Sequence, residues 1–394
     1  MDEQQLITLA RECGTPVYIY DGDAICQRIA EIKALSYAPT EIFAATMANA
    51  HPELLKMYRE SGLGAFVNSI KHLRVCQEAG FSDKEIIWTS TGMNRRQMEA
   101  AIQSNVIINL DSLTQMSLYG MVSNGKSAGL RVNIGDLPNN ESYAGVFVGE
   151  KSRIGVVPEE FSRVIEIAGH FGVSINGLHT YLGTQIKDVA HFKKGAQMLA
   201  EHLKLFSNLE YLDFGGGFAV PEGDEENSFD FNAYGREISN LMEEVSSNYG
   251  RRLKLFLEPG RVIAGDSGYF VTAVTDVKLR EKHKWVFVDG SSAIFPRPLM
   301  YPELANHPHY VLGHKGSAKL SGVTIAGSTT YSRDFLARSS NEIPEDICIG
   351  DLIVFQKAGS YSASSQSDFL GIERPAEVLV RDGEYRVITS GERY

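Results

Sequence analysis

Glycine, glutamate and arginine residues recur in the second half of the chain at positions suited to binding an anion and a charged ring. The stretch LDFGGGF places Gly215, Gly216 and Gly217 in one run, and consecutive glycines let backbone N–H groups approach an anion closely. The stretch LEPGRV places Glu258 three residues before Arg261. The carboxylate could accept from a cationic ring nitrogen and the guanidinium could bind a phosphate or carboxylate. A tight turn and a structural ion pair are the simpler alternatives for these two stretches.

Two further stretches carry polar groups of the same kind. FPRPLMYPE holds Arg297 and Tyr301 four residues apart, which is a plausible clamp for a carboxylate. QKAGSYSAS places Tyr361 on a glycine-rich loop. Each stretch alone is weak evidence, and its meaning depends on where the folded elements place it.

Short apolar runs alternate with longer amphipathic runs across the first two thirds of the chain. Strict alternation of strands and helices implies parallel strands joined by right-handed crossovers. Eight such units predict a closed (β/α)8 barrel, with a doubly wound open sheet as the alternative. The glycine run then follows the seventh strand, where barrel loops usually bind phosphate. The expected strands are EIFAAT, GAFVN, EIIWTS, VIINL, GLRVNI, INGLHTYL, YLDFG and LKLFLEPG, and the expected helices span 51–61, 70–79, 95–104, 157–170, 187–206 and 231–248.

The pattern changes after residue 265, where strands and turns follow one another with almost no helix. The runs GYFVTAVTDVKL, KWVFVDGS, VTIAG, DLIVFQKAG and AEVLVRDGEYRVI predict an antiparallel β domain. TPVYIYD, near the start of the chain, is a further strand that precedes the barrel and could pair with this sheet. We therefore expect a barrel over residues 26–266 and a β domain made of residues 1–25 and 267–394.

Composition excludes several classes of protein. The 394 residues carry a formal net charge of −11 and no long basic run, which argues against a nucleic-acid binder. The four cysteines show no CxxC pairing, so a disulfide framework or zinc site is not expected, and a reducing compartment is. The polar N-terminal stretch resembles no signal peptide, and no long apolar run suggests a membrane span. We expect a cytoplasmic protein.

The ordered set LDFGGGF, EPGR, RPLMY, AGSY and RPAEVLV resembles the fold-type III pyridoxal-phosphate decarboxylases, the family of diaminopimelate, ornithine and arginine decarboxylases. The resemblance covers essentially the whole chain, and RPLMY is most similar to the diaminopimelate branch. It implies an alanine racemase-like barrel and β domain, pyridoxal 5'-phosphate as cofactor, carboxy-lyase chemistry and an amino-acid substrate bearing a carboxylate. No metal is implied.

The resemblance also implies a role for each matching position. Glu258 would pair with the pyridine nitrogen and keep it protonated, so that the ring acts as an electron sink. The positions implied to bind the cofactor are Gly215, Gly216, Gly217, Glu258, Arg261, Tyr361 and Thr184. Those implied to bind the substrate are Arg261, Arg297, Tyr301 and Tyr331, the last standing where the diaminopimelate branch has a glutamate.

The first barrel strand departs from the family's pattern. It ends FAATMAN, where the family has YYAVKAN with a lysine that forms a Schiff base with the cofactor, so Met47 stands at the lysine position. A thioether cannot form an imine and carries no proton. We interpret Met47 as a sign of a site that keeps its ligand but has lost lysine-dependent decarboxylation. Plain packing of a methionine at a strand end is the simpler reading.

Three other positions depart from the family in the same direction. Tyr181 replaces the histidine that stacks on the cofactor ring, and Thr330 replaces the cysteine that protonates the product. Phe66 and His72 stand where acidic residues are expected. Two alternatives to a lysine-free site stay open: Lys71 supplies the amine instead, or a single introduced change put Met47 in place of a native lysine. The correlated departures argue against the second.

Two functions are therefore in competition. One is an amino-acid decarboxylase-type enzyme or a divergent relative that uses the same pocket. The other is a catalytically dead homologue that acts as a binding or regulatory partner, as some members of the ornithine decarboxylase family do. The resemblance further implies a symmetric homodimer with shared active sites, in which GSTTYSRD brings Thr330 and Asp334 near the partner's Met47.

Overall fold

The computed structural model describes residues 1–137, 147–221, 228–302 and 307–392. The chain divides into two compact units, which are described separately. One comprises Ile29–Ala219 and Ser228–Ile263 and is called the barrel unit. The other comprises Met1–Arg28, Val220–Asn227 and Ala264–Tyr394 and is called the β unit.

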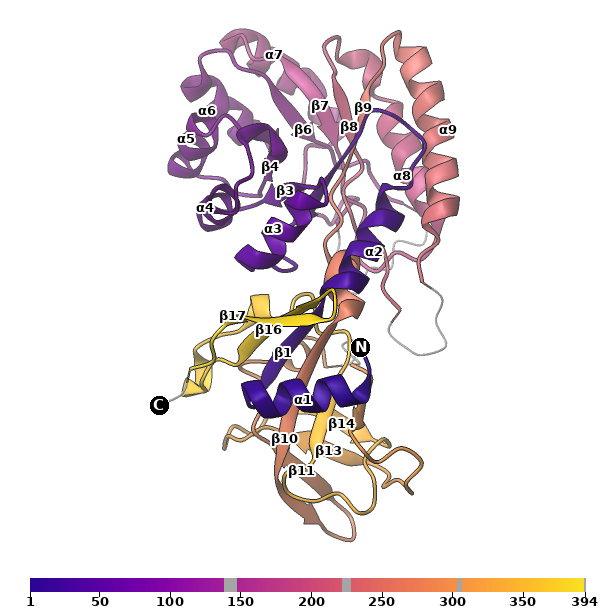
Figure 1. The fold of residues 1–394 in the computed structure, drawn as a ribbon. Helices are drawn as coiled ribbons and strands as arrows, with labels where there is room; N and C mark the ends of the chain where they lie inside the picture. The colour runs from indigo at the N-terminus through magenta and orange to yellow at the C-terminus, as the bar shows by residue number, and fades with distance from the viewer. Residues whose placement is uncertain (138–146, 222–227, 303–306, 393–394) are drawn as a thin grey trace. The chain divides into compact units, whose positions relative to one another are not determined.

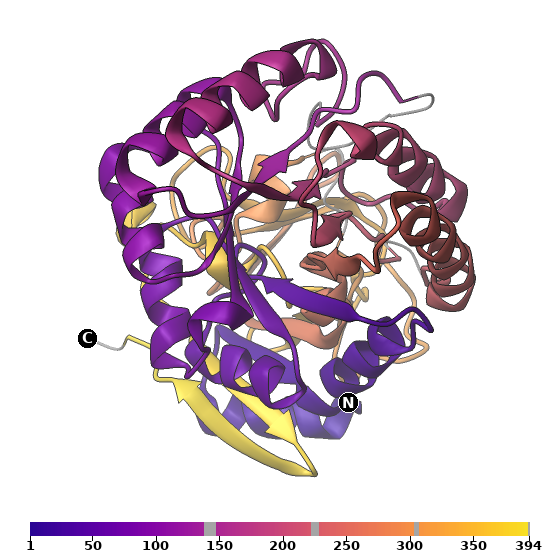
Figure 2. The ribbon, with the colours of Figure 1, turned by 90° about the horizontal axis from the view of Figure 1, so that it is seen from above.

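Eight parallel strands close into a barrel in the barrel unit, and Figure 2 shows its helices arranged around the ring of strands. The closed ring confirms the predicted (β/α)8 architecture and shows that the open-sheet alternative is wrong. Closure is completed by pairing of the first strand with the last, in which Thr40 lies opposite Leu255. The strands are β2 (Thr40–Ala45), β3 (Gly64–Val67), β4 (Ile86–Thr89), β5 (Ile107–Leu110), β6 (Ala128–Arg131), β7 (Ile175–His179), β8 (Tyr211–Asp213) and β9 (Lys254–Leu257).

Several barrel helices begin at polar residues that cap their first turns. Ser69 and Ser112 accept from backbone N–H groups in the first turns of α4 and α6, and Asn94 forms a capping box with Gln97 at the start of α5. Such caps fix where a helix starts and hence which residues are left in the loop after the strand. The helices are α3 (Pro52–Glu60), α4 (Ile70–Glu78), α5 (Arg95–Gln103), α6 (Leu113–Ser123), α7 (Phe161–Phe171), α8 (Val189–Ala200) and α9 (Phe231–Tyr249).

Aromatic side chains fill part of the barrel interior, and they lie opposite glycines, which have no side chain. The ring of Tyr211 stacks on Phe256 at a centroid distance of 4.4 Å, and its hydroxyl donates to Asn109 Oδ1 at 2.7 Å. A Cβ on Gly129 would lie 2.1 Å from the Tyr211 hydroxyl, and one on Gly177 would lie 2.0 Å from the ring. These two strand glycines therefore make room for the tyrosine, as expected where another group approaches the backbone closely.

The β unit is built on a sheet with the order β14-β13-β11-β10-β1-β16-β17, in which β15 also pairs with β10 and β12 pairs with β15. Most pairs are antiparallel, but β1 pairs with β16 and β11 with β13 in parallel, so the sheet is mixed. The strand β1 (Val17–Asp21) lies between β10 and β16 and therefore joins the C-terminal sheet, as TPVYIYD suggested (Figure 1). The other strands are β10 (Gly268–Leu279), β11 (Lys284–Val288), β12 (His309–Val311), β13 (Val323–Ala326), β14 (Phe335–Ser340), β15 (Leu352–Phe355), β16 (Ala376–Arg381) and β17 (Glu384–Thr389).

Two N-terminal helices were not expected from the sequence. The helix α1 (Glu3–Cys13) starts at a capping box between Asp2 and Gln5, and it packs Leu6, Leu9 and Ala10 on the sheet core. The helix α2 (Gly22–Lys33) follows β1, and the four-residue α10 (Arg261–Ala264) and α11 (Arg297–Met300) complete the set of α-helices that the structure describes. The short apolar stripe of α1 has too few turns to stand out in sequence beside its charged residues.

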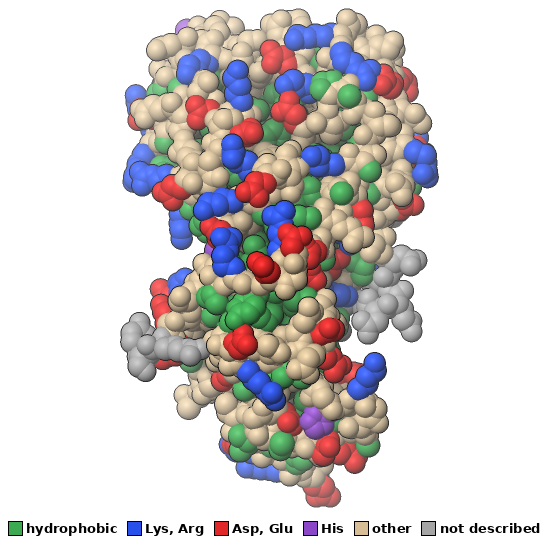
Figure 3. Space-filling view, viewed as in Figure 1, with side chains coloured by type: hydrophobic (Ala, Val, Ile, Leu, Met, Phe, Trp, Pro, Cys, Tyr) green, Lys and Arg blue, Asp and Glu red, His purple; other side chains and the backbone are tan. Residues whose placement is uncertain are grey.

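The described surface agrees with the charge pattern of the sequence. On the face shown in Figure 3, Lys and Arg side chains are interspersed with Asp and Glu over the barrel unit. Within the described parts of the chain, none of the helices combines the length and hydrophobicity needed to cross a membrane.

Candidate functional site

Four buried titratable side chains and one partly buried arginine lie at the C-terminal ends of successive barrel strands. They end or directly follow β5 to β9, and parallel strands in a barrel all end at one face. Their burial removes them from water, so each must be compensated by a neighbour or a ligand. The set comprises Asp111, Arg131, His179, Asp213 and Glu258.

His179, Asp213 and Glu258 form the centre of this set. Their ligating atoms all lie within 4.8 Å of one another, and the Nε2 of His179 is 3.2 Å from a carboxylate oxygen of Glu258. Asp213 accepts the backbone N–H of Gly215 at 2.9 Å through Oδ1. Within the described residues, His179 Nδ1, Asp213 Oδ2 and Glu258 Oε1 are buried and have no hydrogen-bond partner. Three such atoms together indicate a ligand that completes the site.

Burial controls protonation in this cluster. It raises the pKa of Glu258 to about 7, and burial together with the Glu258 charge raises the pKa of Asp213 well above its ordinary value. Burial lowers the pKa of His179 to about 4. At neutral pH the histidine is therefore uncharged, and the two adjacent carboxyl groups hold a proton between them because they repel when both are ionised.

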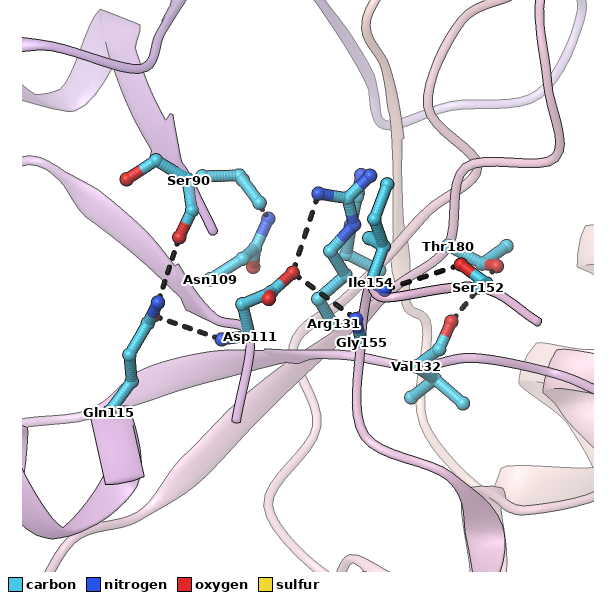
Figure 4. Close-up of polar contacts among 12 residues, drawn as sticks. Ser90, Asn109, Asp111, Gln115, Arg131, Val132, Ser152, Ile154, Gly155 and Thr180 are labelled. Atoms are coloured by element: carbon cyan, nitrogen blue, oxygen red, sulfur yellow. Dashed lines mark hydrogen bonds and ion pairs between the residues drawn. The ribbon is translucent and has the colours of Figure 1, made fainter. Parts of the chain in front are cut away.

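A second network places a cation beside this cluster. The guanidinium of Arg131 lies 3.4 Å from Asp111 Oδ1, which also accepts the N–H of Gly155 at 3.2 Å (Figure 4). The backbone of Asp111 is held in turn by Gln115, whose side-chain amide also donates to the Ser90 carbonyl. Burial lowers the pKa of Arg131, while Asp111 and then Glu258 oppose that change. The arginine thus carries the positive charge that offsets the carboxylates of the barrel mouth.

Sequence reasoning did not single out Asp111, Arg131 or Asp213. Asp213 lies inside LDFGGGF, and Arg131 inside GLRVNI, so both were within recognised stretches. The available signal was positional, because a charged residue at the end of an apolar barrel strand points to a site. Their mutual contacts join different strands and were not accessible from spacing.

The glycine run forms a close-packed loop after β8. A Cβ on Gly216 would lie 2.2 Å from the carbonyl oxygen of Glu258, and one on Gly217 would lie 2.0 Å from that of Gly183. Gly215 and Gly217 have φ values of +64° and +100°, which favour glycine. Because Gly216 and Gly217 donate to no acceptor within the described residues, their N–H groups are available to an anion.

Three other predicted residues lie on loops of the barrel unit. Met47 lies two residues after the end of β2 and packs, partly buried, against the interior cluster that contains Ala45 and Phe66. Tyr181 follows β7 and makes an edge-on contact with Phe147 at a centroid distance of 5.0 Å. Thr184 lies partly buried three residues further on.

Arg261 lies in the barrel unit, where it begins α10, and the other predicted residues belong to the β unit. Arg297 begins α11, and its Nη1 lies 3.3 Å from His307 Nε2. Tyr301 ends that short helix by donating its backbone N–H to the Arg297 carbonyl at 2.9 Å. Tyr361 has a φ of +56°, an unusual conformation for a residue with a bulky side chain.

The loop that contains Thr330 and Tyr331 is held by Asp334. Asp334 Oδ2 accepts from the hydroxyl of Thr329 at 2.6 Å, and Oδ1 from the backbone of Ser292 at 2.6 Å. Thr330 itself is exposed, and Tyr331 contacts Phe369 edge-on at 5.4 Å. The buried Asp334 carboxylate therefore anchors this loop.

The residues of the barrel mouth fit pyridoxal phosphate. The unpartnered Glu258 Oε1 can accept from a protonated pyridine nitrogen, and the free N–H groups of Gly216 and Gly217 suit a phosphate.

Comparison with known proteins agrees with this fit. The model of the pyridoxal-dependent decarboxylase family, pyridoxal binding domain, matches residues 23–265. The chain is 30% identical to a diaminopimelate decarboxylase of Methanothermobacter thermautotrophicus over 98% of this chain and 92% of that protein. It is 26% identical to the L-glutamyl-[BtrI acyl-carrier protein] decarboxylase of Niallia circulans, over 98% and 94%. A crystal structure of diaminopimelate decarboxylase superposes with a TM-score of 0.92 at 24% identity, over 99% of this chain and 94% of that one.

The chain therefore belongs to the family of pyridoxal-dependent decarboxylases, which are carboxy-lyases that use pyridoxal phosphate. This confirms the resemblance drawn from the ordered motifs, including the similarity to the diaminopimelate branch.

Proposed function

We propose that this protein binds pyridoxal 5'-phosphate without a covalent lysine attachment and acts on an amino acid that bears a carboxylate. Its decarboxylation is impaired or diverted relative to the diaminopimelate and ornithine decarboxylases. The observation that carries the proposal is a preserved cofactor cradle in a barrel that offers no lysine at its strand ends.

The C-terminal ends of all eight barrel strands lack a lysine. In a barrel of this kind, reactive side chains come from the strand ends. None of the eight barrel strands has a lysine at its last position or within the two residues that follow it. The pairs that follow β2 and β3 are Thr46-Met47 and Asn68-Ser69. The candidate replacement, Lys71, is exposed in the first turn of α4.

The cradle supports retention of the cofactor. The close approaches at Gly216 and Gly217 leave no room for a side chain, and burial of Glu258 beside neutral His179 has a desolvation cost that a ligand would offset. A barrel that no longer bound a ligand would be relieved of both constraints. We therefore propose that the glycine loop and Arg261 hold the phosphate, that Tyr361 adds a hydroxyl, and that Thr184 lies at the same cofactor.

The substrate assignment follows the family. We propose that Arg297 and Tyr301 bind a carboxylate of the substrate, with Arg261 shared, and that Tyr331 reads its far end. A tyrosine cannot pair with a distal ammonium as a glutamate does, so we expect diaminopimelate to bind as a weaker probe and the preferred substrate to differ from it at that end. The relative from Niallia circulans, which is named for a glutamyl group on a carrier protein, is consistent with such variation within the family.

The test is a titration of the purified protein with pyridoxal phosphate, read by absorbance and by melting temperature. A ligand that binds only the folded state stabilises it by RT ln(1 + [L]/Kd), so the melting temperature should rise with concentration. Arg261→Ala should abolish the rise. Arg163→Ala is the matched control, because Arg163 pairs with Glu166 on the exposed face of α7. Equal cofactor affinity in both variants would show that the phosphate site is misplaced.

A homodimer is a further proposal from the family. In that arrangement Thr330, and the loop that Asp334 anchors, would complete the partner's pocket near Met47. Sedimentation at micromolar concentration should give the mass of a dimer, and a monomer would contradict the shared-site arrangement.

The alternative is a catalytically dead homologue that acts by binding a partner protein, and the absence of a strand-end lysine favours it equally. The titration separates the two. No absorbance change and no rise in melting temperature with pyridoxal phosphate would support a cofactor-free binding role.

A further inference from the structure

We infer that His72, held by Thr46 next to Met47, is the base that removes a proton from the substrate's ammonium group at this site. The inference rests on the proposed function, because it concerns the group that takes over the proton-carrying role of the missing lysine. It assigns to this chain a residue that stands where the family pattern has an acidic one.

Position is the first argument. The strands β2 and β3 are neighbours, with Ala45 opposite Phe66, so the residues that follow them emerge side by side at the barrel mouth. Thr46 and Met47 follow β2, and His72 lies in the first turn of α4, just after β3. The side chain of Thr46 contacts the His72 ring, with 2.9 Å between Oγ1 and Nδ1.

The hydrogen bonds of Thr46 determine the tautomer of His72. A threonine hydroxyl has a single hydrogen, and Thr46 Oγ1 donates it to the carbonyl oxygen of Phe66 at 2.8 Å. The contact with His72 Nδ1 must then use a lone pair of Oγ1, so Nδ1 carries the hydrogen and donates it. In a neutral ring this leaves Nε2 unprotonated and basic. Within the described residues Nε2 has no hydrogen-bond partner.

The surroundings keep the ring neutral at physiological pH. Partial burial lowers the pKa of His72, and the adjacent Lys71 ammonium lowers it further. The ring also lies in the first turn of a nine-residue helix capped by Ser69, where the helix dipole disfavours a positive charge. From β2 the ring faces the uncharged Thr46 and not a carboxylate, so no neighbouring anion there favours the imidazolium.

Without a lysine at this position, another group must remove the proton from the substrate ammonium, and a neutral base can do so. The ammonium group of a free amino acid carries its proton at neutral pH, and in that form its nitrogen has no lone pair to attack a carbonyl. Transfer of one proton from the ammonium to Nε2 gives a neutral amine and an imidazolium, so charge and atoms balance. The Nδ1–H···Oγ1 bond is retained in the imidazolium, so the ring keeps its position during the transfer.

The first measurement needs no cofactor. NMR of protein labelled with 15N at histidine should show His72 at pH 7 as a neutral ring with hydrogen on Nδ1, and its pKa should lie below the ordinary 6.5. Lys71→Gln should raise that pKa. A ring with hydrogen on Nε2, or one that is charged at pH 7, would overturn the inference without any assay of activity.

The second measurement compares His72→Asn with the wild type after saturation with pyridoxal phosphate. The amide nitrogen of asparagine can replace Nδ1 as the donor to Thr46, while the base at Nε2 is lost. We expect the melting temperature and the cofactor affinity to be maintained. The absorbance change on mixing with diaminopimelate should slow about a hundredfold or more, the 10²–10⁴ range of general acid–base catalysis, and added imidazole should partly restore it. His170→Asn, at an exposed histidine of α7, is the control.

The outcomes separate the inference from the proposed function. If the wild type binds no pyridoxal phosphate, the proposed function fails and this inference fails with it. If the cofactor binds and His72→Asn reacts as fast as the wild type, only the role of His72 is refuted. If His72→Asn does not fold, the tautomer and the pKa of the wild-type ring decide.

Discussion

Replacement of Gly216 by alanine provides a direct test of the cofactor cradle. The added methyl carbon would lie 2.2 Å from the carbonyl oxygen and 2.9 Å from the carbonyl carbon of Glu258, and 3.3 Å from the Cα of Pro259. All three are backbone atoms of the segment after β9, so the contact cannot be relieved by rotation of a side chain. The loop and the Glu258 segment must separate by roughly an ångström to restore ordinary contact.

The cost follows from the packing of the site. Forcing one carbon into a close-packed interior destabilises a protein by about 1–3 kcal/mol, and Gly216 is buried. The separation would also move the Glu258 carboxylate and the Gly216 N–H group, which are proposed to bind the two ends of the cofactor. We therefore expect Gly216→Ala to lower the unfolding free energy by about that amount and to weaken pyridoxal phosphate binding more than tenfold.

Gly169→Ala is the matched control. Gly169 lies within α7, and nothing lies within 4 Å of the position that its Cβ would take. Alanine there should stabilise the helix by about 0.5–1 kcal/mol and leave cofactor binding unchanged. Urea unfolding and absorbance titration measure both quantities. Cofactor affinity for Gly216→Ala within twofold of the wild type would refute the proposed role of the glycine loop.

Three further predictions address the lysine position, the buried carboxyl pair and the substrate clamp. In the wild type, borohydride should not attach pyridoxal phosphate to the peptide that contains residues 41–56, whereas Met47→Lys should give a coloured, reducible adduct there; trapping on another native lysine would contradict the reading of Met47. Burial raises the pKa of Glu258 from 4.5 to about 7, so the folded state binds this proton more tightly than the unfolded state does. The contribution of Glu258 to stability is therefore complete below pH 4.5 and is lost as the pH rises toward 7. Glu258→Gln should flatten this decline in the urea midpoint with pH, and an unchanged profile would argue against the shift. His307 Nδ1 lies 2.9 Å from the carbonyl oxygen of Gln356, so the ring donates there and accepts from Arg297 through Nε2. His307→Phe should weaken diaminopimelate binding to the cofactor-loaded protein about tenfold, as measured by calorimetry, because roughly one hydrogen bond to a charged group is lost. Unaltered affinity would show that His307 does not support the proposed carboxylate site at Arg297.

Much of the fold was predictable because its signals are local. Alternating apolar and amphipathic runs define strands and helices through their periodicity, and eight repeats of that pattern are enough to predict a barrel. Capping residues such as Ser69 and Asn94 lie next to the helices that they start. The helix α1 escaped detection because its apolar stripe is short, and what reveals it is packing of Leu6 on a sheet formed mainly by the far end of the chain.

The features of the site likewise fall into those that the sequence determines and those that depend on the tertiary structure. The sequence by itself determined that Met47 follows the first barrel strand, that three glycines follow the seventh, and that Glu258 follows the eighth, because these are statements about neighbours along the chain. Only the tertiary structure decided that three buried groups from β7, β8 and β9 share one cluster with unpartnered atoms, and that Thr46 receives a hydrogen bond from His72. The pKa of Glu258 and the tautomer of His72 depend on desolvation and on hydrogen bonds between strands, which exist only after the barrel has closed.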